Sequence, residues 1–344
     1  MRSAWLLVAG LLTAAVPAHA QQIRDHLEVV TSAAAFGLAA EVSEAYAEHF
    51  RQQPPKVIRS GSGAAIATFC GGLGSRFPDV ALTSRRMSDS ERARCRNNGI
   101  RQIVRAKIGY EAYAVLAHRD FPIDNLSRVA LYGAVGQFVA DGASLVPNTR
   151  TSWDDVASHM PSEPINVFVP SASAPSWEAF VNLVIRPGCQ KVPAMQRLEI
   201  NERLRTCARV RTDGRLGRYR ASDPDLPDML CNQPKALAVV DLANHQRFAP
   251  AMQPIKIDGA APTVAAISQG RYTAAQPLYA YVKAQHYDHV PGFLYYVDEL
   301  TSKRALGRDG YLRDAGVTPL TEAEWQKQRS MAISMIPISL TDTE

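Results

Sequence analysis

The sequence lacks the motifs that mark common metal centres and nucleophilic active sites. No CxxC pair occurs in its 344 residues, so we predict no zinc site, no other bound metal and no cofactor. No serine lies in a Gly-x-Ser-x-Gly elbow, and no histidine has a sequence context that connects it to Ser62. A hydrolase needs such a nucleophile–base pair, so we do not expect an enzyme.

Long apolar runs and basic blocks are also missing. After residue 20, no stretch approaches the roughly 20 apolar residues that span a bilayer. The net charge is +5, but the arginines are dispersed and form no basic stripe with interleaved aromatic residues. This pattern argues against a nucleic-acid partner.

The first 20 residues, MRSAWLLVAGLLTAAVPAHA, are typical of a secretory signal peptide. A single basic residue precedes an apolar run, and the run ends in a small-x-small cleavage pattern. A membrane anchor is the alternative, but Pro17 and His19 interrupt a run that is already short. We expect cleavage of residues 1–20 before Gln21, which leaves a soluble periplasmic protein.

Five cysteines are compatible with export to an oxidising compartment. Cys70 and Cys95 flank one compact segment, and Cys189 and Cys207 flank another. Proximity along the chain favours these two pairings, with Cys231 as a buried free thiol. Cys231 in place of either member of the second pair is the alternative.

Strand–turn–helix units recur in the first part of the mature chain. β-Prone runs at Leu27–Val30, Lys56–Arg59 and Asp79–Leu82 each end in a polar turn, and helical periodicity follows. Thr31 or Ser32 is a candidate N-cap for the first helix. The three units predict an α/β domain with a mainly parallel sheet. Polar turns and helix N-termini meet at the carboxyl ends of such strands, so we expect an anion-binding crevice there.

About 320 mature residues are more than one hydrophobic core usually serves, so a second domain is expected. The β-run Ile108–His118 is long enough to cross between domains. Ile165–Val169 begins another strand–turn–helix unit, and its serine-rich turn is expected to face the first three turns across a cleft. The later runs KALAVVDL and QPLYAYVKAQ are predicted to return the chain to the first domain.

Three passages resemble the phosphate-binding proteins of bacterial phosphate ABC transporters. They are "SGSGAAIATFCGG…PDVALTSRRMSDSERARCRNNGI", the strand "KIGYEAYAVLAHRD" and "IDGAAPTVAAISQGRYTAAQPLYAYVK", which is the most specific of the three. One branch of that family also has cysteines at the two positions in the first passage. The resemblance spans roughly residues 27 to 330.

This resemblance implies a two-lobed type II periplasmic-binding-protein fold, with two crossover strands. Lobe 1 is expected at 21–112 plus 243–344, and lobe 2 at 113–242. The implied function is capture of phosphate, or of another small anionic or polar solute, by a monomer that delivers it to an inner-membrane ABC permease. The candidate ligand-binding residues are Thr31, Ser32, Ser60, Ser62, Gly63, Thr83, Ser84, Arg85, Ser173, Ser176 and Trp177.

Some ligand positions of the family are altered in this chain. Ala33 and Ala34 occupy positions where the family has hydroxyls, and Ala174 and Pro175 replace a Ser-Gly pair in the fourth loop. Each missing charge-assisted hydrogen bond forfeits roughly 1.5–3 kcal/mol of binding free energy. We therefore expect weak phosphate binding, if any, and a ligand with one polar end and one bulkier end against Trp177.

Several of these residues have a structural alternative. Ser62 has that of a helix N-cap, Arg85 that of a solvated surface charge, and Trp177 that of a core residue. Arg211 and Asp213 are interpreted as a salt bridge in a turn rather than as ligand contacts. For the whole protein, the alternative function is an accessory or sensor protein that binds a larger organic ligand or a protein partner without phosphate transport.

Overall fold

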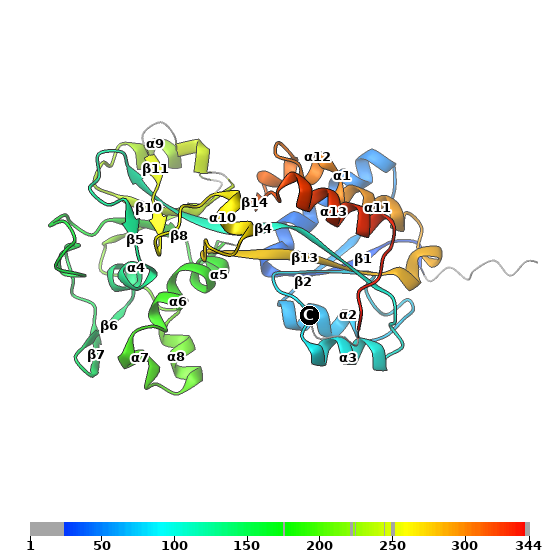
Figure 1. The fold of residues 1–344 in the computed structure, drawn as a ribbon, viewed down its shortest axis with the longest axis horizontal. Helices are drawn as coiled ribbons and strands as arrows, with labels where there is room; N and C mark the ends of the chain where they lie inside the picture. The colour runs from blue at the N-terminus through cyan, green and yellow to red at the C-terminus, as the bar shows by residue number, and fades with distance from the viewer. Residues whose placement is uncertain are drawn as a thin grey trace, which may run out of the picture.

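The strand β4 (Ile103–His118) runs through both lobes of the molecule (Figure 1). The computed structural model describes residues 24–174, 176–220, 223, 225–243, 245–248 and 252–340. The predicted signal peptide and Pro175 lie outside this part of the chain. Within it, no helix is long and apolar enough to span a membrane.

In the first lobe, β1 (Glu28–Ser32) pairs in parallel with β2 (Lys56–Ser60) and with β3 (Val80–Thr83). β13 (Ala275–Lys283) lies antiparallel between β3 and β4, and β14 (Val317–Thr318) also pairs with β4. The three strand–turn–helix units are therefore confirmed. The sheet is mixed because β13, which returns to the lobe that β4 leaves, runs antiparallel to its neighbours.

Helices cover both faces of this sheet, so the strands β1 and β3 are buried, whereas the edge strand β2 is largely exposed. Val29 packs under α1 (Phe36–Phe50) and α11 (Phe293–Thr301), whereas the next residue, Val30, packs with α2 (Ser62–Phe69) on the other face. α3 (Asp89–Asn97) lies beside α2, and α12 (Lys303–Leu306) and α13 (Glu322–Ile333) complete the layer with α1 (Figure 1).

The expected N-cap of the first helix is wrong. A short 3₁₀ turn, η1 (Ala33–Ala35), separates β1 from α1, and Thr31 is still within the strand. Ser32 precedes the 3₁₀ turn, and its side chain makes no capping hydrogen bond. By contrast, α3 begins at a reciprocal capping box that Ser88 and Glu91 form.

In the second lobe, β4 continues into a sheet with the strand order β4-β10-β8-β9. β8 (Val167–Pro170) is parallel to both β9 (Leu216–Tyr219) and β10 (Leu237–Asp241). The other elements of this half are β5 (Asn125–Leu126), α4 (Arg128–Val135), β6 (Phe138–Asp141), β7 (Ser144–Pro147), α5 (Trp177–Phe180), the π-helical η2 (Val181–Ile185), α6 (Arg186–Cys189), α7 (Pro193–Gln196), α8 (Ile200–Thr206) and α9 (Leu226–Cys231).

The chain returns to the first lobe later than the sequence suggested. The segment after β10 contains η3 (His245–Phe248), β11 (Met252–Pro254), β12 (Lys256–Ile257) and α10 (Val264–Ser268). Met252, Ile257 and Ile267 belong to the same hydrophobic core as Val239 of β10. We therefore propose that lobe 2 extends to about residue 274, rather than 242, and that β13 is the return crossover. η4 (Ala284–His289) and η5 (Tyr311–Arg313) follow in lobe 1.

β4 is irregular where it passes between the lobes. Gly109 has φ +140°, and a Cβ at this position would lie 2.5 Å from Cγ1 of Val317. The partner strand β13 shifts register at the same level, between Leu278 and Tyr279. Because Gly109 has no side chain, β14 can pack closely against β4 two residues before Glu111.

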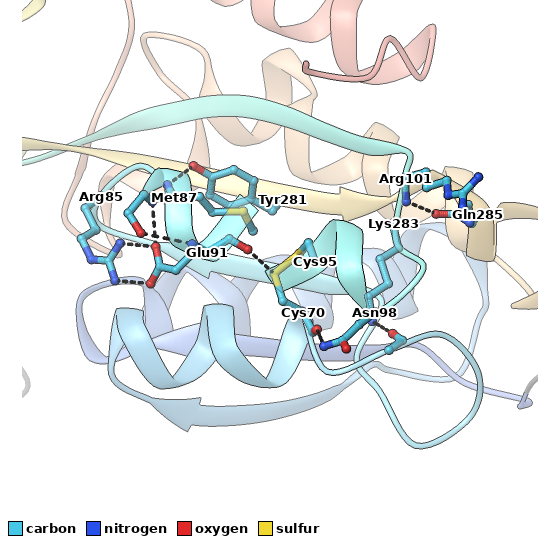
Figure 2. Close-up of a disulfide and its surroundings, with 12 residues drawn as sticks. Cys70, Arg85, Met87, Glu91, Cys95, Asn98, Arg101, Tyr281, Lys283 and Gln285 are labelled. Carbon is cyan, nitrogen blue, oxygen red and sulfur yellow. Dashed lines mark hydrogen bonds and ion pairs between the residues drawn. A yellow bond between two sulfur atoms is a disulfide. The ribbon is translucent and has the colours of Figure 1, made fainter. Parts of the chain in front are cut away.

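Both predicted disulfides are present. Cys70–Cys95 connects the end of α2 to α3 (Figure 2), and Cys189–Cys207 connects α6 to the end of α8. Cys231 is the cysteine outside both disulfides, as expected. It is only partly buried, which corrects the prediction of a buried thiol, and its Sγ lies 3.6 Å from the carbonyl oxygen of Phe248.

Candidate ligand-binding site

A cavity of about 550 Å³ lies between the two lobes. The carboxyl ends of β1, β8, β9 and β10 border it, which is where ligands bind in α/β sheets. Its lining residues are Ala33, Ala34, Gly37, Glu111, Tyr113, Ser173, Ala174, Ser176, Arg220, Asp241, Leu278, Asp314, Ala315, Gly316 and Val317.

Carboxylates dominate the charge of this cavity. Glu111 of β4, Asp241 at the end of β10 and Asp314 line it, whereas Arg220 is the one basic residue among the described lining residues. Burial raises the pKa of Glu111 to about 7, although the amide of Gln276 donates a hydrogen bond of 2.7 Å to its Oε2. The negative charges of Glu178 and Asp241 raise this pKa further.

The fourth turn is held by the crossover strand. The hydroxyl of Tyr113 donates a hydrogen bond of 2.8 Å to the carbonyl oxygen of Ser176. This bond places two predicted ligand residues, Ser173 and Ser176, in the cavity wall. Their contact with a ligand remains a prediction.

Trp177 does not line the cavity. It is partly buried against the core of lobe 2, with its ring centroid 5.4 Å from that of Phe180. The guanidinium of Arg218 lies 5.2 Å from its ring centroid. This placement corresponds to the core alternative rather than to an aromatic wall of the cavity.

The second and third polar turns meet each other beside the cavity rather than in it. Oγ of Ser62 lies 3.1 Å from Oγ of Ser84 and accepts a hydrogen bond from the Ser84 N–H. Gly61 is the N-cap of α2, so Ser62 is not the cap residue. Ser60 bonds only locally, to the carbonyl oxygen of Gly61. Neither Ser60 nor Gly63 lines the cavity.

Arg85 lies next to these turns, but its charge is compensated (Figure 2). Its guanidinium donates two hydrogen bonds, of 2.8 and 2.7 Å, to the carboxylate of Glu91. The same carboxylate accepts the N–H of Ser88 in the capping box of α3. Arg85 therefore contributes to helix capping, and a bound anion would have to compete with Glu91.

The hydroxyls at the strand ends fall into two groups. Those of Thr31 and Thr83 are buried and bond to the carbonyl oxygens of Ser32 and Arg85, so they fix the turns. Oγ of Ser32, by contrast, is buried and has no hydrogen-bond partner in the described part of the chain. Ser32 directly precedes Ala33 of the cavity wall.

Arg211 and Asp213 form the salt bridge that the sequence suggested, with a distance of 2.9 Å from Nε to Oδ1. Arg211 is buried, and it also donates to the carbonyl oxygens of Ala134 and Arg150. It supports lobe 2 from within and lines no part of the cavity.

Sequence reasoning missed the charged residues of the cavity. Arg220 directly follows β9 and Asp241 ends β10, so a polar residue at a strand end was an available signal. Glu111 interrupts the apolar run of the crossover strand, which was a second signal. In the described residues, no group of three or more His, Cys, Asp or Glu side chains could hold a metal ion.

Comparison with known proteins supports the same architecture. The sequence model of the PBP superfamily domain matches residues 16–299. The crystal structure of a possible phosphate binding protein from Planctomyces limnophilus superposes with a TM-score of 0.70 at 17% identity, covering 90% of this chain and 98% of that one. An ABC-type phosphate transport receptor from Vibrio cholerae gives a TM-score of 0.56, also at 17% identity, covering 86% and 99%.

A curated relative matches only in part. Protein SphX of Synechococcus elongatus is 25% identical over 148 residues, which is 42% of this chain and 40% of that protein. The structural likenesses establish the fold, and the sequences are too different for ligand contacts to be carried over.

Proposed function

The chain belongs to the PBP superfamily, and from this premise we propose that it is an exported, non-catalytic solute-binding protein of an ABC-type uptake system. It acts as a periplasmic monomer that binds a small polar solute between its lobes and presents it to an inner-membrane permease. The observation that carries this proposal is the interlobe cavity, because strand ends from both lobes border it.

The cavity lies beside the two strands that connect the lobes. Glu111 and Tyr113 on β4 and Leu278 on β13 form part of its wall. A change in the relative orientation of the lobes would therefore change the shape of the site directly, which is how hinge closure couples to binding. A solute that contacts both walls stabilises the closed arrangement.

Inorganic phosphate fits this site poorly. A desolvated phosphate needs hydrogen-bond donors around its oxygens, and a buried unpaired charge is very costly. The cavity instead presents three carboxylates, and alanine side chains at Ala33, Ala34 and Ala174. We therefore favour another polar solute.

The proposal is tested by blocking the cavity. Gly37 lines it, and a Cβ added there meets no atom within 4 Å, so Gly37→Trp is chosen to fill the space. Ala143→Trp, in the exposed hairpin between β6 and β7, is the control. Native mass spectrometry of protein secreted to the periplasm should show a small-molecule adduct on the wild type and on Ala143→Trp.

The adduct should be absent from Gly37→Trp. An adduct that persists in this variant places solute binding elsewhere. If the wild type carries no adduct and gains none in periplasmic extract, the accessory or sensor function is favoured, because hydroxyls are lost at three positions where the family has them.

A further inference from the structure

We propose that the solute carries a cationic amino group and that Glu111 and Asp241 bind this group. The inference rests on the proposed function, because it names the class of solute that the interlobe cavity takes. It assigns a role to two carboxylates that the sequence patterns did not single out.

The backbone brings the two carboxylates together on one face of the sheet. Asp241 of β10 is paired with Tyr113 of β4, and Glu111 lies two residues before Tyr113 on the same strand. Side chains two residues apart in a strand point to the same side, and all three residues line the cavity. Diagonal neighbours on antiparallel strands are about 7–8 Å apart, so one ammonium group can contact both carboxylates.

No cation is among the groups that shift the pKa of Glu111. Its one hydrogen-bond partner in the described part of the chain is the neutral amide of Gln276 on β13. Asp241 of β10 and Glu178 of α5 add negative charge around it. A half-buried carboxylate whose neighbours are neutral or negative is unfavourable in the empty protein. A bound ammonium group would remove this cost.

An unpaired hydroxyl directly before the lining residue Ala33 gives independent support for a polar ligand. Ser32 is only 3% exposed, and its Oγ has no hydrogen-bond partner among the residues that the structure describes. It stands at the end of β1, directly before Ala33 of the cavity wall. A hydroxyl that is buried without a partner costs free energy, and an N–H of the solute would satisfy it.

The apolar part of the wall suits an organic body. Ala33, Ala34, Leu278 and Val317 are apolar, and Tyr113 adds an aromatic ring. The cavity volume of about 550 Å³ lies within the range of small-molecule sites and exceeds what a bare ion needs. The expected solute is therefore an amine with a carbon skeleton.

Three probes with the same four-carbon chain test this assignment. 1,4-Diaminobutane, 1,4-butanediol and succinate differ in their ends, which are ammonium, hydroxyl and carboxylate. Calorimetry at pH 8 should show binding of the diamine, with the diol and succinate at least about 100-fold weaker, since two charge-assisted hydrogen bonds are lost. Failure of millimolar diamine to bind, or tighter binding of succinate or phosphate, overturns the inference.

Variants locate the interaction. Glu111→Gln and Asp241→Asn should each weaken diamine binding by at least about tenfold. Asp120→Asn removes an exposed carboxylate of lobe 2 and should leave the affinity unchanged. Unfolding midpoints of all three variants exclude loss of fold as the cause. Unchanged affinity in both cavity variants would refute the role of these carboxylates.

Gly37→Trp distinguishes a wrong amine assignment from a wrong binding site. If succinate or the diol binds the wild type and Gly37→Trp abolishes this binding, the cavity is the solute site and only the amine assignment fails. If the diamine binds equally well to Gly37→Trp, the proposed site itself is wrong.

Discussion

Replacing Glu111 with glutamine should stabilise the empty protein at alkaline pH. In the unfolded chain the carboxyl group has an ordinary pKa of 4.5, and burial raises the pKa to about 7 in the folded state. The folded protein therefore holds a proton between pH 4.5 and 7 that the unfolded chain has lost. Its free energy of unfolding should fall as the pH rises through this window, and should change no further through this group above pH 7.

The size of the effect follows from the two pKa values. The interval from 4.5 to about 7 corresponds to about 3 kcal/mol, which is an upper limit for the contribution of this group. Glutamine cannot ionise, and its carbonyl oxygen can still accept the hydrogen bond from Gln276. Glu111→Gln should thus match the wild type near pH 4.5 and exceed its stability by up to about 3 kcal/mol at pH 8.

Urea unfolding followed by circular dichroism at pH 4.5, 6 and 8 measures this difference. Glu44→Gln is the matched control, because Glu44 is exposed on α1. The reasoning is refuted if Glu111→Gln is less stable than the wild type at pH 8. It also fails if the variant keeps the full pH dependence of the wild type between pH 4.5 and 7.

Three further predictions concern the framework and the ligand. Cys189→Ser opens the disulfide to Cys207, with a sequence separation of 18, and should lower the free energy of unfolding by about 3 kcal/mol, measured in urea. Asp79 is fully buried between Arg24 and His286, so Asp79→Asn should cost about 3–5 kcal/mol, and an unchanged urea midpoint would contradict this. Calorimetry with inorganic phosphate should give a Kd weaker than about 1 μM, and sub-micromolar binding would show that other donors replace the missing ones.

Much of the fold was predictable because local patterns and global architecture agree. The runs ending at Val30, Arg59 and Leu82 became parallel strands that each lead into a helix, and the first and third alternate between two buried faces. The return crossover was harder to place, because the residues after β10 form only short strands. Met252 and Ile257 show their membership of lobe 2 only through packing.

The site was less predictable, because its chemistry depends on contacts between distant segments. Arg85 follows a strand end as an anion ligand would, but the capping box of α3 brings Glu91 onto its guanidinium. Glu111 looks like a tolerated charge in an apolar run, and only the meeting of β4 with β10 and with distant turns shows that it lines the cavity. Neither the Arg85–Glu91 contact nor the position of Glu111 in the cavity wall can be recognised from the sequence of a single segment.

Two kinds of sequence change at this site favour a cation over an anion: hydrogen-bond donors are lost and acceptors are gained. Ala33, Ala34 and Ala174 remove hydroxyl donors from positions that line the cavity. Glu111 and Asp241 add acceptors to its wall, and Glu91 pairs with Arg85 of lobe 1. An anion depends on donors and a cation depends on acceptors, so each change lowers affinity for phosphate and raises it for an amine. On the proposed assignment, the fold keeps its lobes, crossover strands and cavity while the charge of its solute is reversed.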